Sequence, residues 1–139
     1  MRNYPVIAAA LLVLASSAFA ASPVSERRAS FKEFKRTAAP MGKMLNGGTY
    51  DPAEFAKMAK QLDALSGKPW QYFPAGSSST DTKAEIWSKP AEFKKAIADY
   101  QAATSKLSQV AAAGDVNQVR AQFRLVQRSC KTCHDSFRS

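Results

Sequence analysis

The feature that most constrains this chain lies near its C-terminus, where the sequence reads Cys130-Lys131-Thr132-Cys133-His134. This C-x-x-C-H spacing is the attachment signature of a c-type haem. Residues three apart share one face of a helix, so the thiols of Cys130 and Cys133 can both reach one porphyrin edge and form thioethers. His134 follows directly and can ligate the iron through a ring nitrogen. The motif therefore predicts one covalent haem c per chain, with His134 as the metal ligand.

Two other uses of a C-x-x-C pair fit this sequence less well. A thioredoxin-like redox pair expects a strand before it in a βαβ setting, whereas this pair closes a long helical pattern. A zinc site would need more cysteines or histidines, and the chain has two cysteines and one histidine, all within the motif. The histidine count also excludes bis-histidine ligation of iron. The sixth iron position is therefore open or taken by Met41, Met44 or Met58.

The first 20 residues have the pattern of a secretory signal peptide. Arg2 supplies the positive start, residues 6–15 are an apolar run too short to span a bilayer, and residues 18–20 read Ala-Phe-Ala, an A-x-A cleavage site. We expect residues 1–20 to be removed and residues 21–139 to form one domain in the periplasm, with no membrane attachment. An uncleaved anchor is disfavoured because no stop-transfer pattern follows.

The charge of the chain is basic but dispersed. The full sequence carries a formal net charge of +9, and the signal segment contributes only Arg2, so +8 remains. The basic residues are spread along amphipathic segments, without the aromatic-interleaved block of a nucleic-acid binder. We therefore expect no nucleic-acid partner. Export to an oxidising compartment would permit a disulfide between Cys130 and Cys133, but haem attachment uses both thiols.

Apolar residues repeat every three or four positions in four segments, which predicts four helices. The first covers residues 24–46, with Pro40 expected to kink it or end it early. The second starts at Pro52 after an Asp51 cap. The third runs from about Ser88, which is expected to cap it, to Ala113, and the fourth follows an Asp115 cap. Residues 67–87 form a long connection, whose aromatic residues we expect to pack across the helices.

The apolar repeat of the fourth helix also contains both thiols. Its positions step by three and four, and they are Val116, Val119, Phe123, Val126, Cys130, Cys133 and Phe137. The haem is therefore expected inside the core rather than on the surface. Four helices of this length, with a tight Gly114-Asp115 joint, predict an all-α fold: an antiparallel four-helix bundle with covalently bound haem c.

Nearly the whole predicted mature chain resembles cytochrome c′, the class II c-type cytochromes. Five segments carry the resemblance: Arg27-Arg28-Ala29-Ser30-Phe31-Lys32, Pro69-Trp70-Gln71-Tyr72-Phe73-Pro74-Ala75-Gly76, Glu85-Ile86-Trp87-Ser88-Lys89-Pro90-Ala91-Glu92-Phe93, Ala113-Gly114-Asp115, and Ser129-Cys130-Lys131-Thr132-Cys133-His134-Asp135-Ser136-Phe137-Arg138. The resemblance implies a periplasmic homodimer with a five-coordinate, high-spin iron that binds NO and CO. The implied roles are NO binding or protection and, less directly, electron transfer with a periplasmic redox partner.

The resemblance also implies roles for three residues outside the haem motif. Arg27 matches an arginine that lies near a haem propionate, and Phe31 matches the apolar residue covering the distal face, opposite the ligating histidine. Arg138 matches a basic residue beside the proximal imidazole. A phenylalanine stands here where leucine or methionine is commoner, so a bulky group that cannot ligate iron would have to move before a gas binds.

Two other functions remain as alternatives. One is a low-spin class II electron carrier, in which Met41 or Met44 would supply the sixth iron ligand. The other is a haem peroxidase, which needs a distal acid–base pair. The apolar repeat of the first helix holds only Phe, Ala, Met and Leu, so we expect the protein not to be an enzyme.

Overall fold

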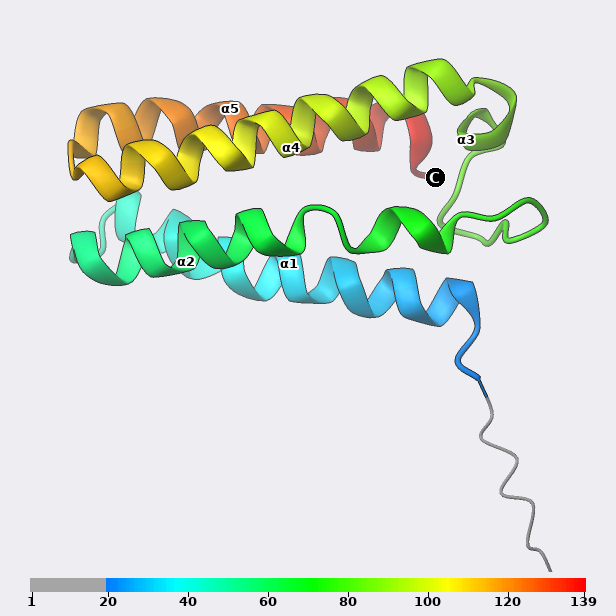
Figure 1. The fold of residues 1–139 in the computed structure, drawn as a ribbon, viewed down its shortest axis with the longest axis horizontal. Coiled ribbons are helices and arrows are strands. Elements are labelled where there is room, and N and C mark those ends of the chain that lie inside the picture. The colour runs from blue at the N-terminus through cyan, green and yellow to red at the C-terminus, as the bar shows by residue number, and fades with distance from the viewer. Residues whose placement is uncertain (1–19) are drawn as a thin grey trace, which may run out of the picture.

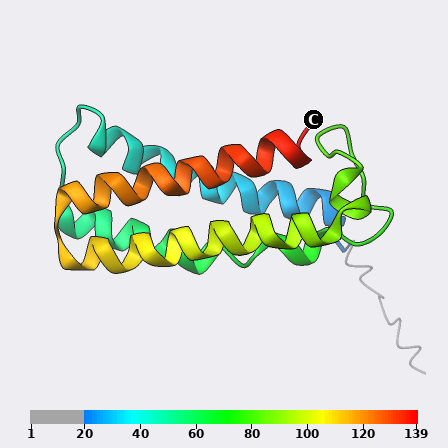
Figure 2. The same cartoon turned by 90° about the horizontal axis from the view of Figure 1, so that it is seen from above.

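The computed structural model describes residues 20–139, and the predicted signal segment lies outside them except for Ala20. Four long helices form two layers (Figures 1 and 2). One layer contains α1 (Pro23–Leu45) and α2 (Pro52–Leu65), and the other contains α4 (Pro90–Ala113) and α5 (Val116–Phe137). No strand occurs in the described part of the chain. The predicted four-helix bundle is therefore confirmed.

Three of the long helices begin at residues whose side chains satisfy free backbone donors. Ser22 accepts from the Ser25 N–H at 3.2 Å, and Asp51 accepts from the Glu54 N–H at 3.0 Å. Asp115 accepts from two N–H groups of the first turn of α5. The preceding Gly114 has φ +84°, a left-handed conformation that other residues rarely adopt. This residue pair makes the sharp reversal that lays α5 against α4.

The connection between the layers is more ordered than the sequence indicated. Within residues 67–87 the chain forms a short 3₁₀ helix, η1 (Pro69–Tyr72), and enters α3 (Glu85–Ser88). Ser88 does not cap the third long helix. The cap position is Lys89, which makes no side-chain capping bond. The prediction that Ser88 caps this helix was wrong because Ser88 is the last residue of α3.

The core consists of two clusters joined by an aromatic side chain from the connection. The larger cluster fills the bundle and includes Met41, Phe55, Leu107 and Phe123. The smaller cluster consists of Ile86, Phe93 and Phe137, near the end of α5. Trp70 packs against both clusters, and Phe73 and Trp87 pack against the smaller one. The expected packing of connection aromatics across the helices is therefore confirmed.

In residues 20–139 no helix combines the length and the apolar character that crossing a membrane requires.

One of the two sequence expectations was that the first helix ends at Pro40, and that expectation was wrong. The helix continues through Pro40 to Leu45, with the proline ring exposed. A proline inside a helix cannot donate its backbone N–H to the carbonyl four residues earlier, here that of Arg36. Packing therefore maintains the helix across this break, since Met41 and Leu45 beyond it are buried in the core.

We predict that Pro40→Ala stabilises the protein by about 1–3 kcal/mol, because the new N–H can donate to the Arg36 carbonyl. Urea unfolding of the haem-loaded protein measures the change. Pro52→Ala is the matched control. Pro52 opens α2, where its missing N–H costs nothing, so this change should stay within about 0.5 kcal/mol. Equal stability of the Pro40→Ala protein and its parent would show that the ring does not strain α1.

Candidate functional site

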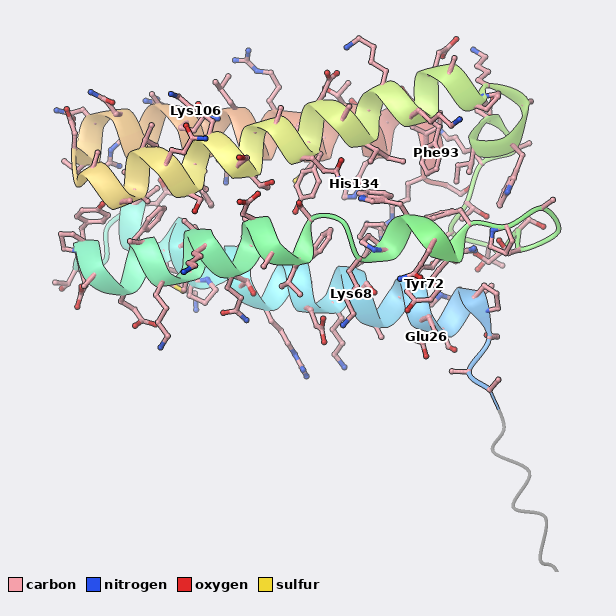
Figure 3. The ribbon with its side chains drawn as sticks, in the orientation of Figure 1. Glu26, Lys68, Tyr72, Phe93, Lys106 and His134 are labelled. Carbon is pink, nitrogen blue, oxygen red and sulfur yellow. The ribbon has the colours of Figure 1, made fainter. Side chains whose placement is uncertain are left out.

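A cavity of about 510 Å³ lies where α1 faces the C-terminal half of α5. Its wall is mainly aromatic and aliphatic, with contributions from α1, α2, η1, α3 and α4 as well as α5. All six residues that the sequence predicted for the site line this cavity: Arg27, Phe31, Cys130, Cys133, His134 and Arg138. In Figure 3, His134 lies over the same half of the molecule as Phe93, Tyr72 and Glu26, while Lys106 lies toward the other end. The fold thus brings together residues up to 111 positions apart.

The two thiols lie on the core-facing side of α5. Cys130 packs against the larger core cluster and Cys133 against the smaller one, and they are not joined in a disulfide. Burial raises the pKa of both thiols, and that of Cys133 reaches about 11, with a further contribution from Cys130. In the protein without haem, both groups are therefore neutral thiols facing the cavity near neutral pH.

His134 follows the second thiol at the cavity wall. Partial burial lowers the pKa of its imidazole, the Arg138 guanidinium lowers it further, and Asp135 opposes the change. A lowered pKa favours the neutral ring, which is the form that binds a metal. The contact with Arg138 is electrostatic, and it places a fixed positive charge beside this ring.

Phe31 borders the cavity from α1 and is only partly buried. Its ring makes edge contacts with Phe34, Trp70 and Phe73, at centroid distances of 5.6, 5.7 and 6.3 Å. Such aromatic contacts favour a fixed ring orientation over a freely rotating one. Phe31 therefore belongs to a packed aromatic group rather than projecting alone.

Arg27 is the most unusual polar residue of the site, because its side chain is charged and only 2% exposed. It donates to the Tyr72 carbonyl at 3.3 Å and to the hydroxyls of Ser77 and Ser79 at 3.1 and 2.9 Å. Its guanidinium also lies 4.9 Å from the centroid of the Phe73 ring, a cation–π distance. Burial is the main cause that lowers its pKa. These three neutral acceptors engage three of the five N–H donors of the guanidinium. The nearby Asp81 carboxylate opposes the lowering of the pKa without contacting Arg27 directly.

Sequence reasoning missed the polar contacts made by residues 77–83. Arg28 donates two hydrogen bonds to Asp81, at 3.0 and 2.6 Å. Lys83 donates its backbone N–H to the Phe137 carbonyl at 3.0 Å and its ammonium to the Asp135 carbonyl at 2.7 Å. These hydrogen-bond partners are about 50 positions apart in the sequence and one of each pair lies in a loop, so no repeating pattern in the sequence reveals them. The run of basic residues at the start of α1 was the only feature that pointed to acceptors nearby.

The methionines do not lie at the site. Met41 is fully buried in the core, Met58 is also buried there, and Met44 packs against the same cluster. None of the three borders the cavity. A methionine ligand would require α1 or α2 to move.

The cavity fits a haem in the chemistry of its residues. Two thiols three residues apart and an adjacent imidazole face one mainly apolar space, whose volume lies in the range of small-molecule sites. The buried guanidinium of Arg27 makes no direct ion pair with a carboxylate of the described residues and has donors left over, which matches the propionate groups that a haem carries. A metal ion held by side chains alone is not indicated, since residues 20–139 contain no cluster of three or more His, Cys, Asp or Glu suited to one.

Comparisons with known proteins agree on one family. The profile of the family described as Cytochrome C' matches residues 22–138. A cytochrome c′ of Alcaligenes xylosoxydans xylosoxydans is 42% identical over 89 residues, which are 64% of this chain and 70% of that protein. A cytochrome c′ of Rhodopseudomonas palustris is 31% identical over 138 residues, 92% of this chain and 91% of that protein. Among solved structures, the nitric oxide complex of a cytochrome c prime variant from Alcaligenes xylosoxidans matches with a TM-score of 0.81 at 35% identity, covering 86% of this chain and 98% of the other.

We predict that Ser77→Ala destabilises the protein by about 1–3 kcal/mol, because the buried guanidinium of Arg27 loses an acceptor. Ser77 is itself 8% exposed and also donates to the Pro74 carbonyl at 2.8 Å. Urea unfolding gives the change, and Ser78→Ala at the exposed neighbouring position is the matched control. If the two variants are equally stable, the hydroxyl of Ser77 does not support the buried charge.

Proposed function

Because the chain belongs to the cytochrome c′ family, which binds haem c, we propose that it is a gas-binding protein whose five-coordinate, high-spin iron takes up NO and CO. Cys130 and Cys133 attach the haem, and His134 is the single protein ligand of the iron. Among the described residues, no methionine and no second histidine borders the cavity. That observation carries the proposal, since it leaves the side opposite His134 without the usual internal ligands of c-type iron.

Three further residues shape the site. Arg27 holds a buried positive charge at the cavity and receives a propionate. Burial is the main cause that lowers the pKa of His134, and Arg138 beside it adds to this effect, because its positive charge disfavours a second proton on the ring. Phe31 covers the distal side and is held by Trp70 and Phe73. A ligand must displace this ring to enter, so small diatomic molecules are favoured over larger ones.

The polarity of the distal side accounts for the choice among diatomic gases. When bound, the haem supplies an iron atom with one open coordination position. Bound O₂ is stabilised by a hydrogen-bond donor, whereas NO and CO depend on one much less. Phe31, Phe34 and Phe73 have no hydrogen-bond donor in their side chains, and the indole N–H of Trp70 is already donated to the Ser66 carbonyl. The solved nitric oxide complex of a related cytochrome c prime supports NO as the ligand class.

We assign the protein to the periplasm as a homodimer without enzymatic activity. The signal pattern of residues 1–20 supports export, with residues 21–139 as the mature domain. Peroxidase chemistry would require an acid–base pair on the distal side, and the cavity wall contributed by α1 around Phe31 is apolar apart from basic residues. NO binding or protection is therefore the proposed role, with electron exchange with a periplasmic partner as a secondary one.

The absorption spectrum of the purified protein, ferric and reduced, tests the iron's coordination. We expect a broad reduced Soret band, no sharp split visible bands, and a large change on adding CO, since no methionine reaches the iron. Met41→Ala and Met44→Ala should leave the spectrum unchanged. Sharp low-spin bands that do not respond to CO, lost in one of these variants, would replace the proposal with a methionine-ligated electron carrier.

A separate prediction concerns the role of Phe31 in ligand entry. Phe31→Ala should raise the rate of CO association severalfold, because the ring no longer has to leave the distal side before the ligand enters. Flash photolysis of the reduced CO complex measures this rate. Leu125→Ala removes an exposed apolar side chain of α5 that does not border the cavity and is the control for an apolar truncation elsewhere. An unchanged rate in Phe31→Ala would show that this ring does not guard the iron.

A further inference from the structure

We propose that residues 77–83 form a strap that holds the start of α1 against the haem-bearing end of α5, with Asp81 and Lys83 as positioning residues for the distal ring Phe31. The inference rests on the proposed function, because it concerns how ligand entry is limited. In this proposal, a loop that is distant in sequence from both α1 and α5 limits the rate at which a ligand enters.

Helices α1 and α5, which face each other across the cavity, depend on other elements for most of their packing. At the described positions α1 packs mainly on α2 and η1, and α5 mainly on α4 and α3. At the end away from the cavity, α5 is tied to α1 by Arg120, which donates to the Leu45 carbonyl. At the cavity end, the polar links between α1 and α5 run through residues 77–83.

The strap is attached to α1 by two neighbouring arginines. Arg27 donates to the Ser77 and Ser79 hydroxyls, and Arg28 pairs with both carboxylate oxygens of Asp81. The Ser79 hydroxyl in turn donates to Asp81 at 2.7 Å, so the two attachments form one network. Arg27 and Phe31 are four residues apart and therefore share one face of α1. The attachment fixes the helix turn that directly precedes the distal ring.

The other end of the strap is attached to the last turn of α5. Lys83 bonds the Asp135 and Phe137 carbonyls through its ammonium and its backbone N–H. The last carbonyls of a helix have no partners within it, and a cation near them is favoured by the helix dipole. These carbonyls belong to the turn that carries His134. The strap itself borders the cavity at Asp81 and Thr82.

This arrangement limits how far the cavity can widen. Phe31 can yield to a ligand by turning its ring or by moving with the start of α1. Trp70 and Phe73 hinder the first movement, and the strap hinders the second. The Arg28 and Asp81 side chains are 53% and 35% exposed, so their ion pair adds little to global stability. A substitution that removes one of these strap contacts should therefore change the rate of ligand entry more than it changes the free energy of unfolding.

The test uses Asp81→Asn and Lys83→Met in the haem-loaded protein. Each should raise the CO association rate severalfold, while the urea midpoint stays near that of the control. Lys95→Met is the matched control, since it removes an exposed lysine–aspartate pair on α4 that does not border the cavity. Lys83→Arg keeps a side-chain donor for the Asp135 carbonyl and should keep the slow rate of the parent protein. In a Phe31→Ala background, the strap variants should raise the CO association rate little further, because the Phe31 truncation and the strap substitutions act on the same barrier to ligand entry.

Amide hydrogen exchange gives a second readout that needs no gas. If the strap couples the helices, Asp81→Asn also raises exchange in the last turn of α5, although Asp81 contacts α1. An increase in amide exchange that is confined to residues 77–83 in both Asp81→Asn and Lys83→Met would overturn the proposal. CO association rates equal to that of Lys95→Met would also overturn it. A wild-type protein that does not bind CO would refute the gas-binding function, and the exchange result would still decide the strap.

Discussion

The structure depends on one apolar face of α5 that serves two purposes. Val119, Phe123 and Val126 are buried against the other helices, and Cys130 and Cys133 continue the same face into the cavity. Because the helix repeat is 3.6 residues, the three-residue spacing that suits two thioethers is also the spacing that keeps both thiols on the core side. The haem site is therefore a continuation of the bundle core rather than a pocket added to its surface.

The polar side of the site is organised by a buried charge. Arg27 is nearly inaccessible to solvent and is surrounded by a carbonyl, two hydroxyls and an aromatic face. A buried cation is tolerated only where its donors are satisfied, so the loop that follows η1 must adopt the conformation that supplies these acceptors. The conformation of this loop then brings Asp81 to Arg28 and Lys83 to the end of α5. One buried side chain thus specifies much of a segment that has little regular structure.

The sequence was informative where periodicity or a fixed motif operates. The helix positions and the Asp51 and Asp115 caps follow from repeats of three and four and from capping residues, and the Cys130–His134 site follows from the C-x-x-C-H pattern. The places of Arg27, Phe31 and Arg138 at the cavity followed only from the family resemblance. Periodicity was uninformative for the connection, whose shape is set by contacts across about 50 residues. The sequence left open whether α1 continues past Pro40 or ends there, because local propensity disfavours continuation and only the burial of Met41 and Leu45 overrides that preference.

The sequence separation of these contacts has a consequence for the order of folding. The α4–α5 pair joins through a two-residue turn, so its contacts are local and close with little loss of chain entropy. The contacts of residues 77–83 with α1 and with α5 each span about 50 residues and must wait for larger loops to close. The cysteine-bearing helix can thus be formed and paired while the cavity is still open at one end. This order of folding would let a planar macrocycle reach the two thiols before the contacts of residues 77–83 form.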